Sequence, residues 1–197
     1  MAGYGRRSVV GMGVLGGVAL VLSGCAVPAE SGQRRLSPTT QTPDGRFAEF
    51  TEYVPEKLEI RTDLGPLERR MPGIGISSAH WVSQYWQEER EFLPPQDRPI
   101  WTHVVMTVEP GSAQALAEAS SGPAEPLPGI YPDLRQYVPK DDAFTTIPKT
   151  KAEEILDVEH MIQDDPNTAE PHHFQTDQAV ICADSNLLIL IAKEWHT

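Results

Sequence analysis

Hydrophobic and polar positions alternate most regularly over residues 100–108. One face of this segment carries Ile100, Thr102, Val104, Met106 and Val108, and the other carries Trp101, His103, Val105 and Thr107. A period of two is typical of a β-strand, and large side chains on both faces indicate that both are at least partly covered. The pattern therefore predicts a strand over residues 100–108.

A second β pattern closes the chain. Two apolar runs, residues 178–183 and 187–193, flank the polar turn Asp184-Ser185-Asn186, which predicts a β-hairpin. Residues 187–191 are apolar at every position, as in a strand that is buried on both faces. We therefore expect this second run to lie centrally in a sheet.

Residues 79–92 follow a helical period instead. Ser77 or Ser78 can cap a helix here, and Pro94-Pro95 would stop it. Its apolar side carries Trp81, Val82, Tyr85, Trp86 and Phe92, and its polar side carries Gln87, Glu88, Glu89 and Arg90. We interpret the aromatic stripe as a core face rather than a ligand site, because aromatic side chains bury much area.

Two further helices are predicted from their N-terminal signals. Ser112 can cap a short alanine-rich helix that ends before Gly122. Thr150 and Glu153 match a capping box, and the apolar positions after them predict a helix over residues 150–163.

The remaining segments give weaker patterns. Six prolines make most of residues 122–148 irregular, a rigid wrap over the core with one or two helical turns in residues 131–138. Residues 47–54 have a helical spacing, residues 58–62 fit a short strand, and residues 69–75 suggest a loop. Together the elements predict one α+β domain, residues 47–197, with a mixed or antiparallel sheet covered by two or three helices, including those at 79–92 and 150–163.

The first 24 residues differ from everything that follows. Arg6 and Arg7 precede an apolar run from residue 9 to residue 22, and the segment contains no acidic residue. A basic region followed by a short apolar region is the pattern of a secretory signal peptide, and the run is too short for a membrane span. It ends in Leu22-Ser23-Gly24-Cys25.

These four residues resemble the lipobox of bacterial lipoprotein precursors. The resemblance covers residues 1–25 only, and implies that residues 1–24 are a lipoprotein signal peptide and that Cys25 is lipidated. The lipid would then anchor the chain at the outer, extracytoplasmic face of the cell membrane. Arg6 and Arg7 also resemble a twin-arginine export signal. An ordinary signal peptide and a short retained anchor helix remain alternatives.

Residues 25–46 connect this leader to the domain. They are rich in Pro, Ser, Thr, Gln and Gly, which predicts a flexible tether with a span of roughly 25 Å. Without Arg6 and Arg7 the chain has 14 basic and 28 acidic residues (16 − 2 against 28), a net charge of −14. Such a charge repels phosphate backbones and anionic lipid headgroups, so we expect no nucleic acid as a partner and membrane contact through the lipid anchor alone. Cys182 would be the remaining cysteine, and its apolar neighbours predict a buried thiol.

The sharpest candidate chemistry is a metal site in the predicted helix over residues 150–163. Spacings of four, three and four would place four residues on one face: Glu153, Asp157, His160 and Asp164. His172 and His173 follow, and imidazole with carboxylate is a ligand set for zinc. The chain lacks a dense zinc motif such as HExxH, and alternating charge is also typical of a solvated helix face.

Two functions follow from these patterns. The first is a non-enzymatic, lipid-anchored module that binds a protein or small-molecule ligand and needs no cofactor beyond the covalent lipid on Cys25. The alternative is a small metal-assisted hydrolase that uses the region of His160, His172 and His173. His80 and His103, each beside a tryptophan, are interpreted as structural. The chain contains no P-loop, dinucleotide fingerprint or Gly-x-Ser-x-Gly elbow.

Overall fold

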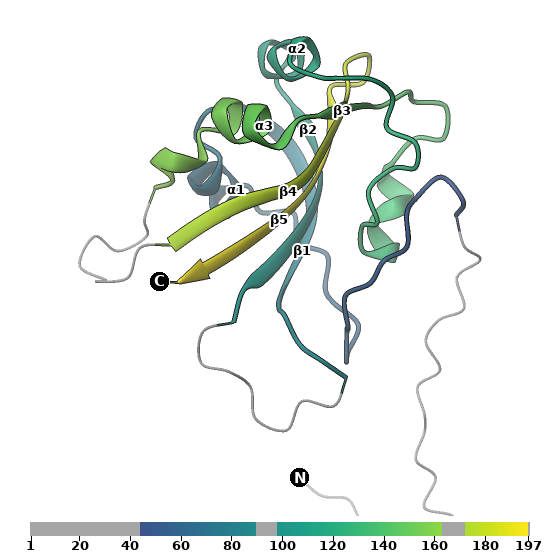
Figure 1. Ribbon diagram of the computed structural model, residues 1–197, viewed down its shortest axis with the longest axis vertical. Helices are drawn as coiled ribbons and strands as arrows, with labels where there is room; N and C mark the ends of the chain where they lie inside the picture. The colour runs from purple at the N-terminus through teal and green to yellow at the C-terminus, as the bar shows by residue number, and fades with distance from the viewer. Residues whose placement is uncertain (1–43, 90–97, 163–171, 197) are drawn as a thin grey trace, which may run out of the picture. The chain divides into compact units, whose positions relative to one another are not determined.

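The computed structural model describes residues 44–89, 98–162 and 172–196. In these residues the strands form one antiparallel sheet with the order β1-β2-β5-β4-β3 (Figure 1). The strands are β1 (Ile76–Tyr85), β2 (Ile100–Val108), β3 (Thr145–Ile147), β4 (His172–Cys182) and β5 (Leu187–His196). With the helices described below, the sheet gives the domain the predicted α+β class.

The predicted strand over residues 100–108 is confirmed as β2. It pairs with β1 on one side and with β5 on the other. The C-terminal hairpin is also present, because β4 and β5 pair antiparallel around a turn in which Asn186 has a φ of 54°. Leu188, Ile189 and Leu190 are fully buried, as expected for a strand covered on both faces.

The predicted helix over residues 79–92 is wrong, because its first half, residues 79–85, belongs to β1. Residues 90–92 lie outside the described residues. The spacing of its apolar residues fits two structures equally well: a helix with one apolar side and a strand that is buried on both faces. Trp81 packs into the core on one face of the sheet, whereas its neighbour Val82 packs into the core on the other. Pairing with the full length of β2, from Tyr85↔Ile100 to Ile76↔Val108, favours the strand. Ser77 and Ser78 therefore cap no helix.

The α-helices are short. They are α1 (Gly65–Arg70), α2 (Pro110–Glu118) and α3 (Lys149–Leu156), and two 3₁₀ helices, η1 (Pro132–Tyr137) and η2 (Val158–His160), accompany them. The alanine-rich helix is α2, but it begins at Pro110, and the Ser112 hydroxyl instead accepts a hydrogen bond of 3.1 Å from the Gly75 N–H. Among the described helices, none is long and apolar enough to cross a membrane.

The predicted helix over residues 150–163 is too long, and its capping box does not form. Helix α3 follows Pro148 without a side-chain cap and ends at Leu156, because Asp157 adopts the left-handed conformation with a φ of 58°. Aspartate tolerates that conformation better than most residues. The Gly73 N–H then donates to the Leu156 carbonyl at 3.1 Å, which satisfies a carbonyl at the helix end.

The sheet separates two hydrophobic cores. On one face, Met106, Leu188 and Leu190 pack with residues of α1, α2 and α3. On the other face, Trp101, Val105 and Ile189 pack against η1, the irregular residues around it and the segment that begins at residue 44 (Figure 1). Trp81, Trp101 and Cys182 are buried in these cores, so the two tryptophans fill the interior rather than line a cleft.

The N-terminal segment of the domain forms neither the helix nor the strand suggested for it. Residues 48–60 carry no regular element, and Arg61 makes an isolated bridge with Trp81 at the edge of β1. Phe47 makes another bridge, parallel, with Leu127. Residues 44–46, which the sequence analysis assigned to the tether, are thereby hydrogen-bonded to the domain: the Leu127 N–H donates to the Arg46 carbonyl at 2.8 Å.

Candidate functional site

A cavity of about 620 Å³ lies beside the point where residue 44 joins the domain. Two segments that are distant in sequence line it, one from Asp44 to Lys57 and the other along η1 and the residues that follow. Its charged lining residues are Asp44, Arg46, Lys57, Asp133, Arg135 and Lys140. Four cations and two carboxylates give this cavity a formal charge of +2 in a strongly acidic chain.

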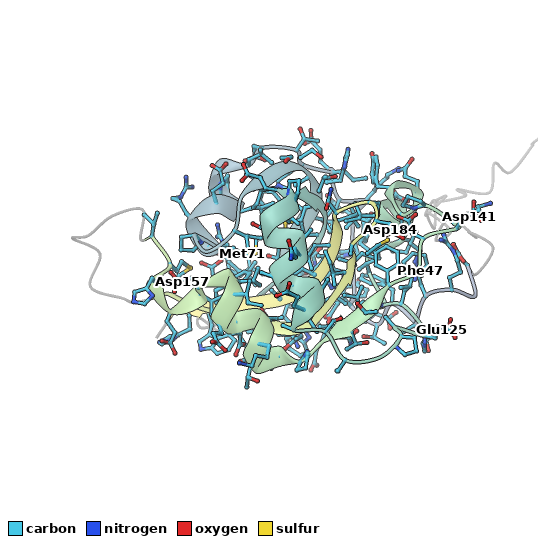
Figure 2. All side chains as sticks on the ribbon, turned by 90° about the horizontal axis from the view of Figure 1, so that it is seen from above. Phe47, Met71, Glu125, Asp141, Asp157 and Asp184 are labelled. Carbon is cyan, nitrogen blue, oxygen red and sulfur yellow. The ribbon has the colours of Figure 1, made fainter. Side chains whose placement is uncertain are left out.

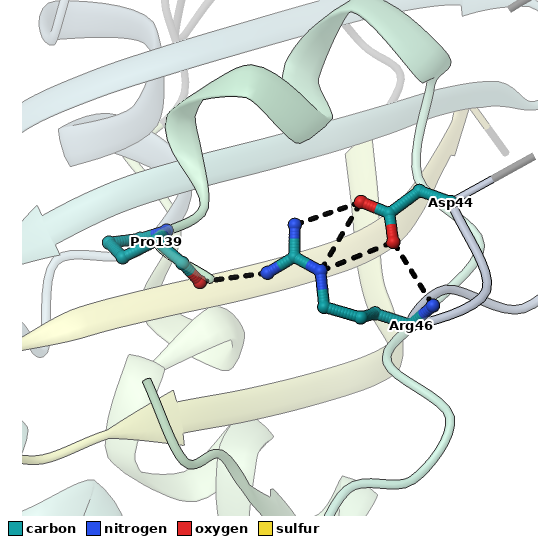
Figure 3. A network of polar contacts seen from close by, with 3 residues as sticks. All are labelled: Asp44, Arg46 and Pro139. Carbon is teal, nitrogen blue, oxygen red and sulfur yellow. Dashed lines mark hydrogen bonds and ion pairs between the residues drawn. The ribbon is translucent and has the colours of Figure 1, made fainter. Parts of the chain in front are cut away.

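Arg46 is held in place at the rim of the cavity. Its Nη2 donates to Asp44 Oδ2 at 2.9 Å, and its Nη1 donates to the Pro139 carbonyl at 2.8 Å (Figure 3). The hydrogen bond from the Arg46 side chain is the main cause that lowers the pKa of Asp44, so this carboxyl stays ionised. Arg46 therefore ties the first residues of the domain to the end of the η1 segment.

Lys57 and Asp133 form a second ion pair, with Nζ and Oδ2 3.0 Å apart. The hydrogen bond to Asp133 raises the pKa of Lys57. Because Lys57 comes from the N-terminal segment and Asp133 from η1, this pair also joins the two walls of the cavity.

Arg135 differs from these paired cations. In the described part of the chain its guanidinium forms no ion pair, although the charge of Asp44 favours its charged form, and its Nη2 makes a long hydrogen bond of 3.4 Å to the Ala48 carbonyl. Its Nε is buried without a hydrogen-bond partner among the same residues. Burial lowers the pKa of Arg135, because the charged form loses hydration, but an arginine stays charged near neutral pH.

Phe47 gives this cation a fixed support. Its buried ring lies 5.0 Å from the Arg135 guanidinium carbon and 5.2 Å from that of Arg46. A guanidinium that packs against an aromatic ring loses conformational freedom before any ligand arrives. Lys140 also lines the cavity, is exposed and has no ion-pair partner in the described ranges. The cavity thus combines one cation supported by an aromatic ring and one exposed cation, and neither is in contact with a carboxylate.

The predicted metal site is not assembled as expected. Asp157 and His160 are in contact, with Oδ1 and Nδ1 2.5 Å apart, but helix α3 ends before both, so Glu153, Asp157 and His160 do not share a helix face. Figure 2 shows Asp157 on the opposite side of the view from Phe47, so this region is separate from the charged cavity. His173 lies on β4, and its ring stacks on Trp195.

Carboxylates do gather near Asp157, but other groups already contact them. A cavity of about 360 Å³ is lined by Glu153, Glu154, Asp157 and Glu159. Glu153 accepts a hydrogen bond from the Thr176 N–H, and Lys151 pairs with Glu154 at 2.7 Å. Within residues 44–89, 98–162 and 172–196, no group of three or more side chains could hold a metal ion. Asp164 and the side chain of His172 lie outside what is described, so zinc binding stays a prediction.

The other predicted site residues also lie outside the described residues: Arg6, Arg7, Leu22, Ser23, Gly24 and Cys25. The charged cavity could not be predicted from the sequence, because its lining residues come from two segments about 80 positions apart that carry no shared motif. The one usable signal was Arg135 and Lys140 inside the proline-rich segment of an acidic chain.

The histidines interpreted as structural have structural surroundings. His103 is buried, and its Nδ1 accepts a hydrogen bond of 2.9 Å from the Tyr131 N–H. His80 stacks on Tyr137 with 3.6 Å between the ring centroids. Both therefore connect the sheet to η1 and to the residue that precedes it.

No protein-family model matches the chain, and neither curated proteins nor solved structures give a significant match.

Proposed function

We propose that this chain is a membrane-anchored, extracytoplasmic lipoprotein whose domain acts as a binding module, with the charged cavity as its ligand site. The observation that carries the anchoring is the order Arg6-Arg7, apolar run, Leu22-Ser23-Gly24-Cys25. Signal peptidase would remove residues 1–24, and Cys25 would carry the lipid. The tether would then hold the domain at the outer face of the cell membrane.

The binding role is supported by the form of the cavity. Ligand sites in proteins are concave, have volumes of several hundred Å³ and contain a few well-placed polar groups. The cavity beside residue 44 has this size, and its walls are held together by the Arg46 hydrogen bond to the Pro139 carbonyl and by the Lys57–Asp133 pair. Arg46 and Lys57 already form ion pairs, and Arg46 also donates to a backbone carbonyl. Arg135 and Lys140 are therefore the cations that would contact a ligand.

The anchoring is tested by cell fractionation combined with metabolic labelling by a fatty-acid analogue. The wild-type chain should carry the label and sediment with membranes, whereas Cys25→Ser should lose the label and move to the soluble fraction. Cys182→Ala is the matched control, because it removes the other cysteine from the buried core and should leave both label and location unchanged. An unlabelled wild-type chain, or a Cys25→Ser chain that remains in the membrane, would refute the anchor.

The binding role is tested separately from the anchor. A binding module should capture a ligand or partner in crosslinking from intact cells and should turn over no ester or peptide substrate. Hydrolysis of a generic ester or peptide library by the purified chain, without any captured partner, would instead support the metal-assisted hydrolase.

A further inference from the structure

We infer that the charged cavity binds a phosphate-bearing anion, either the headgroup of a membrane phospholipid or a soluble phosphate ester. This proposal rests on the proposed function, because a lipid-anchored domain would be held close to phospholipid headgroups. Its basis is the juxtaposition of Arg135 and Lys140, neither of which forms an ion pair within the described residues, in the lining of a cavity of about 620 Å³.

The chemistry of the two cations suits phosphate. A guanidinium presents a planar set of N–H donors that match two oxygens of a phosphate, and an ammonium group adds a compact charge. The Arg135 guanidinium packs against Phe47, so it is oriented before binding. The formal charge of +2 in the cavity balances the charge of a phosphate monoester near neutral pH.

The cavity also differs from the rest of the domain in the sign of its formal charge. The mature chain has a net charge of −14 (14 basic against 28 acidic residues), so most of its surface repels anions. An anion is attracted only where cations exceed carboxylates locally. Affinity for a free anion is therefore expected to be weak, in the millimolar range of a single phosphate contact rather than that of a high-affinity receptor.

The tether compensates for weak affinity when the ligand is a headgroup. Asp44 lines the cavity and follows Cys25 by 19 positions (44 − 25), so the predicted tether would join the anchored lipid to the cavity. A flexible tether of this length would span roughly 25 Å and give an effective concentration in the millimolar range. A site that is too weak to recruit the domain from solution would thus be occupied on the membrane.

The first experiment measures binding of soluble phosphate. The full-length mature chain, purified in a neutral detergent, is titrated with inorganic phosphate and with glycerol 3-phosphate by calorimetry or NMR. The double variant Arg135→Gln with Lys140→Gln should weaken binding by about tenfold or more, the loss expected for charged hydrogen bonds. Lys151→Gln is the control, because it removes one charge from the exposed face of α3 and should leave affinity unchanged.

The second experiment identifies the source of the phosphate. The chain is reconstituted into galactolipid vesicles, which contain no phosphate, with a small fraction of headgroup-photoactivatable phosphatidylglycerol. Adducts within residues 132–140 that glycerol 3-phosphate suppresses identify the headgroup as the ligand. Soluble binding that depends on Arg135 and Lys140, without such adducts, identifies a soluble phosphate ester.

Two results overturn the inference. One is the absence of phosphate binding at millimolar concentration, with no adducts in the cavity, while circular dichroism shows a folded chain. The other is equal loss of binding in Lys151→Gln and in the double variant. The mass of the N-terminal peptide from the same sample reports lipidation of Cys25. An unlipidated chain that binds phosphate refutes the anchor alone, and a lipidated chain that binds none refutes the phosphate site alone.

Discussion

Arg70 and Glu194 form an ion pair on the face of the sheet that is covered by helices α1, α2 and α3. Arg70 Nη2 lies 2.7 Å and Arg70 Nε 2.8 Å from the same carboxylate oxygen, Oε2 of Glu194. The Glu194 side chain is only 4% exposed, whereas that of Arg70 is 25% exposed. Because Arg70 also donates to the Pro66 carbonyl, the pair connects helix α1 to the end of strand β5. It holds α1 against the sheet at a position where the sheet buries a carboxylate.

Removal of one partner of this pair should destabilise the domain strongly. Arg70→Met is expected to lower the free energy of unfolding by about 3 kcal/mol, because it leaves the Glu194 carboxylate buried without this partner. The double variant with Glu194→Leu should be closer to wild type than the sum of the single losses. Urea unfolding of the wild type, the two single variants and the double variant measures this coupling. Asp63→Asn is the control: its pair with Arg61 is about half exposed, and the expected cost is below ~1 kcal/mol.

The same substitution should have opposite effects at two glycines. A Cβ at Gly73 would collide with the Ile155 carbonyl oxygen at the end of α3, so Gly73→Ala is expected to cost about 1–3 kcal/mol. A Cβ at Gly111 meets nothing within 4 Å and lies in the first turn of α2, so Gly111→Ala should be neutral or stabilise by up to ~1 kcal/mol. Thermal unfolding compares the two. Equal effects would contradict the close approach at Gly73.

The elements that could be predicted from the sequence are those with one dominant pattern. The strict alternation over residues 100–108 admits only a strand, and the apolar runs around Asp184-Ser185-Asn186 admit little but a hairpin. Two structures fit the spacing of Trp81, Val82, Tyr85 and Trp86. One is a helix with one apolar side, and the other is a strand with two apolar faces. Long-range pairing with β2 decides between them, and local periodicity contains no information about that pairing.

Backbone conformation and tertiary assembly account for the other differences. The end of α3 depends on the left-handed conformation of Asp157, although the apolar spacing continues to Ile162. The charged cavity depends on the bridge between Phe47 and Leu127, which brings the start of the domain to η1. Neither is a property of a single segment, so local spacing can select Asp157 and His160 as candidate residues but cannot bring Arg135 and Lys140 together with residues of the N-terminal segment.

His103 should stay neutral in the folded protein far below its ordinary titration range. Burial lowers its pKa from 6.5 to about 3, with a smaller contribution from the charge of Lys193. The Tyr131 N–H donates to Nδ1, so Nε2 carries the single ring proton. In an NMR titration the imidazole signals of His103 should not shift between pH 8 and about pH 4. A titration centred near pH 6.5 would contradict this environment.

The neutral state of His103 also makes the domain less stable in acid. Between pH 6.5 and about pH 3 the unfolded chain binds a proton at this residue that the folded chain does not, so the free energy of unfolding falls as the pH decreases. From pH 7 to pH 5 this group should contribute a loss of about 2 kcal/mol. His103→Gln keeps an acceptor for the Tyr131 N–H and removes the proton-binding site. Urea unfolding at the two pH values should therefore show a smaller acid loss in the variant than in wild type.

The pKa of His160 should be shifted in the opposite direction, above its ordinary value. The hydrogen bond to Asp157 is the main cause that raises the pKa of His160 above 6.5, and the charges of Asp157 and Glu159 add to it. Because the folded-state pKa is raised, the contribution of this pair to stability is complete below pH 6.5 and is lost as the pH rises through the folded-state pKa. Asp157→Asn keeps a residue that tolerates the left-handed conformation and removes the charge, so the pKa of His160 should fall toward 6.5 in an NMR titration. Glu159→Gln should lower it less, since Glu159 acts without a hydrogen bond. A wild-type pKa at or below 6.5, or an equal effect of the two variants, would show that the Asp157–His160 contact does not persist in solution.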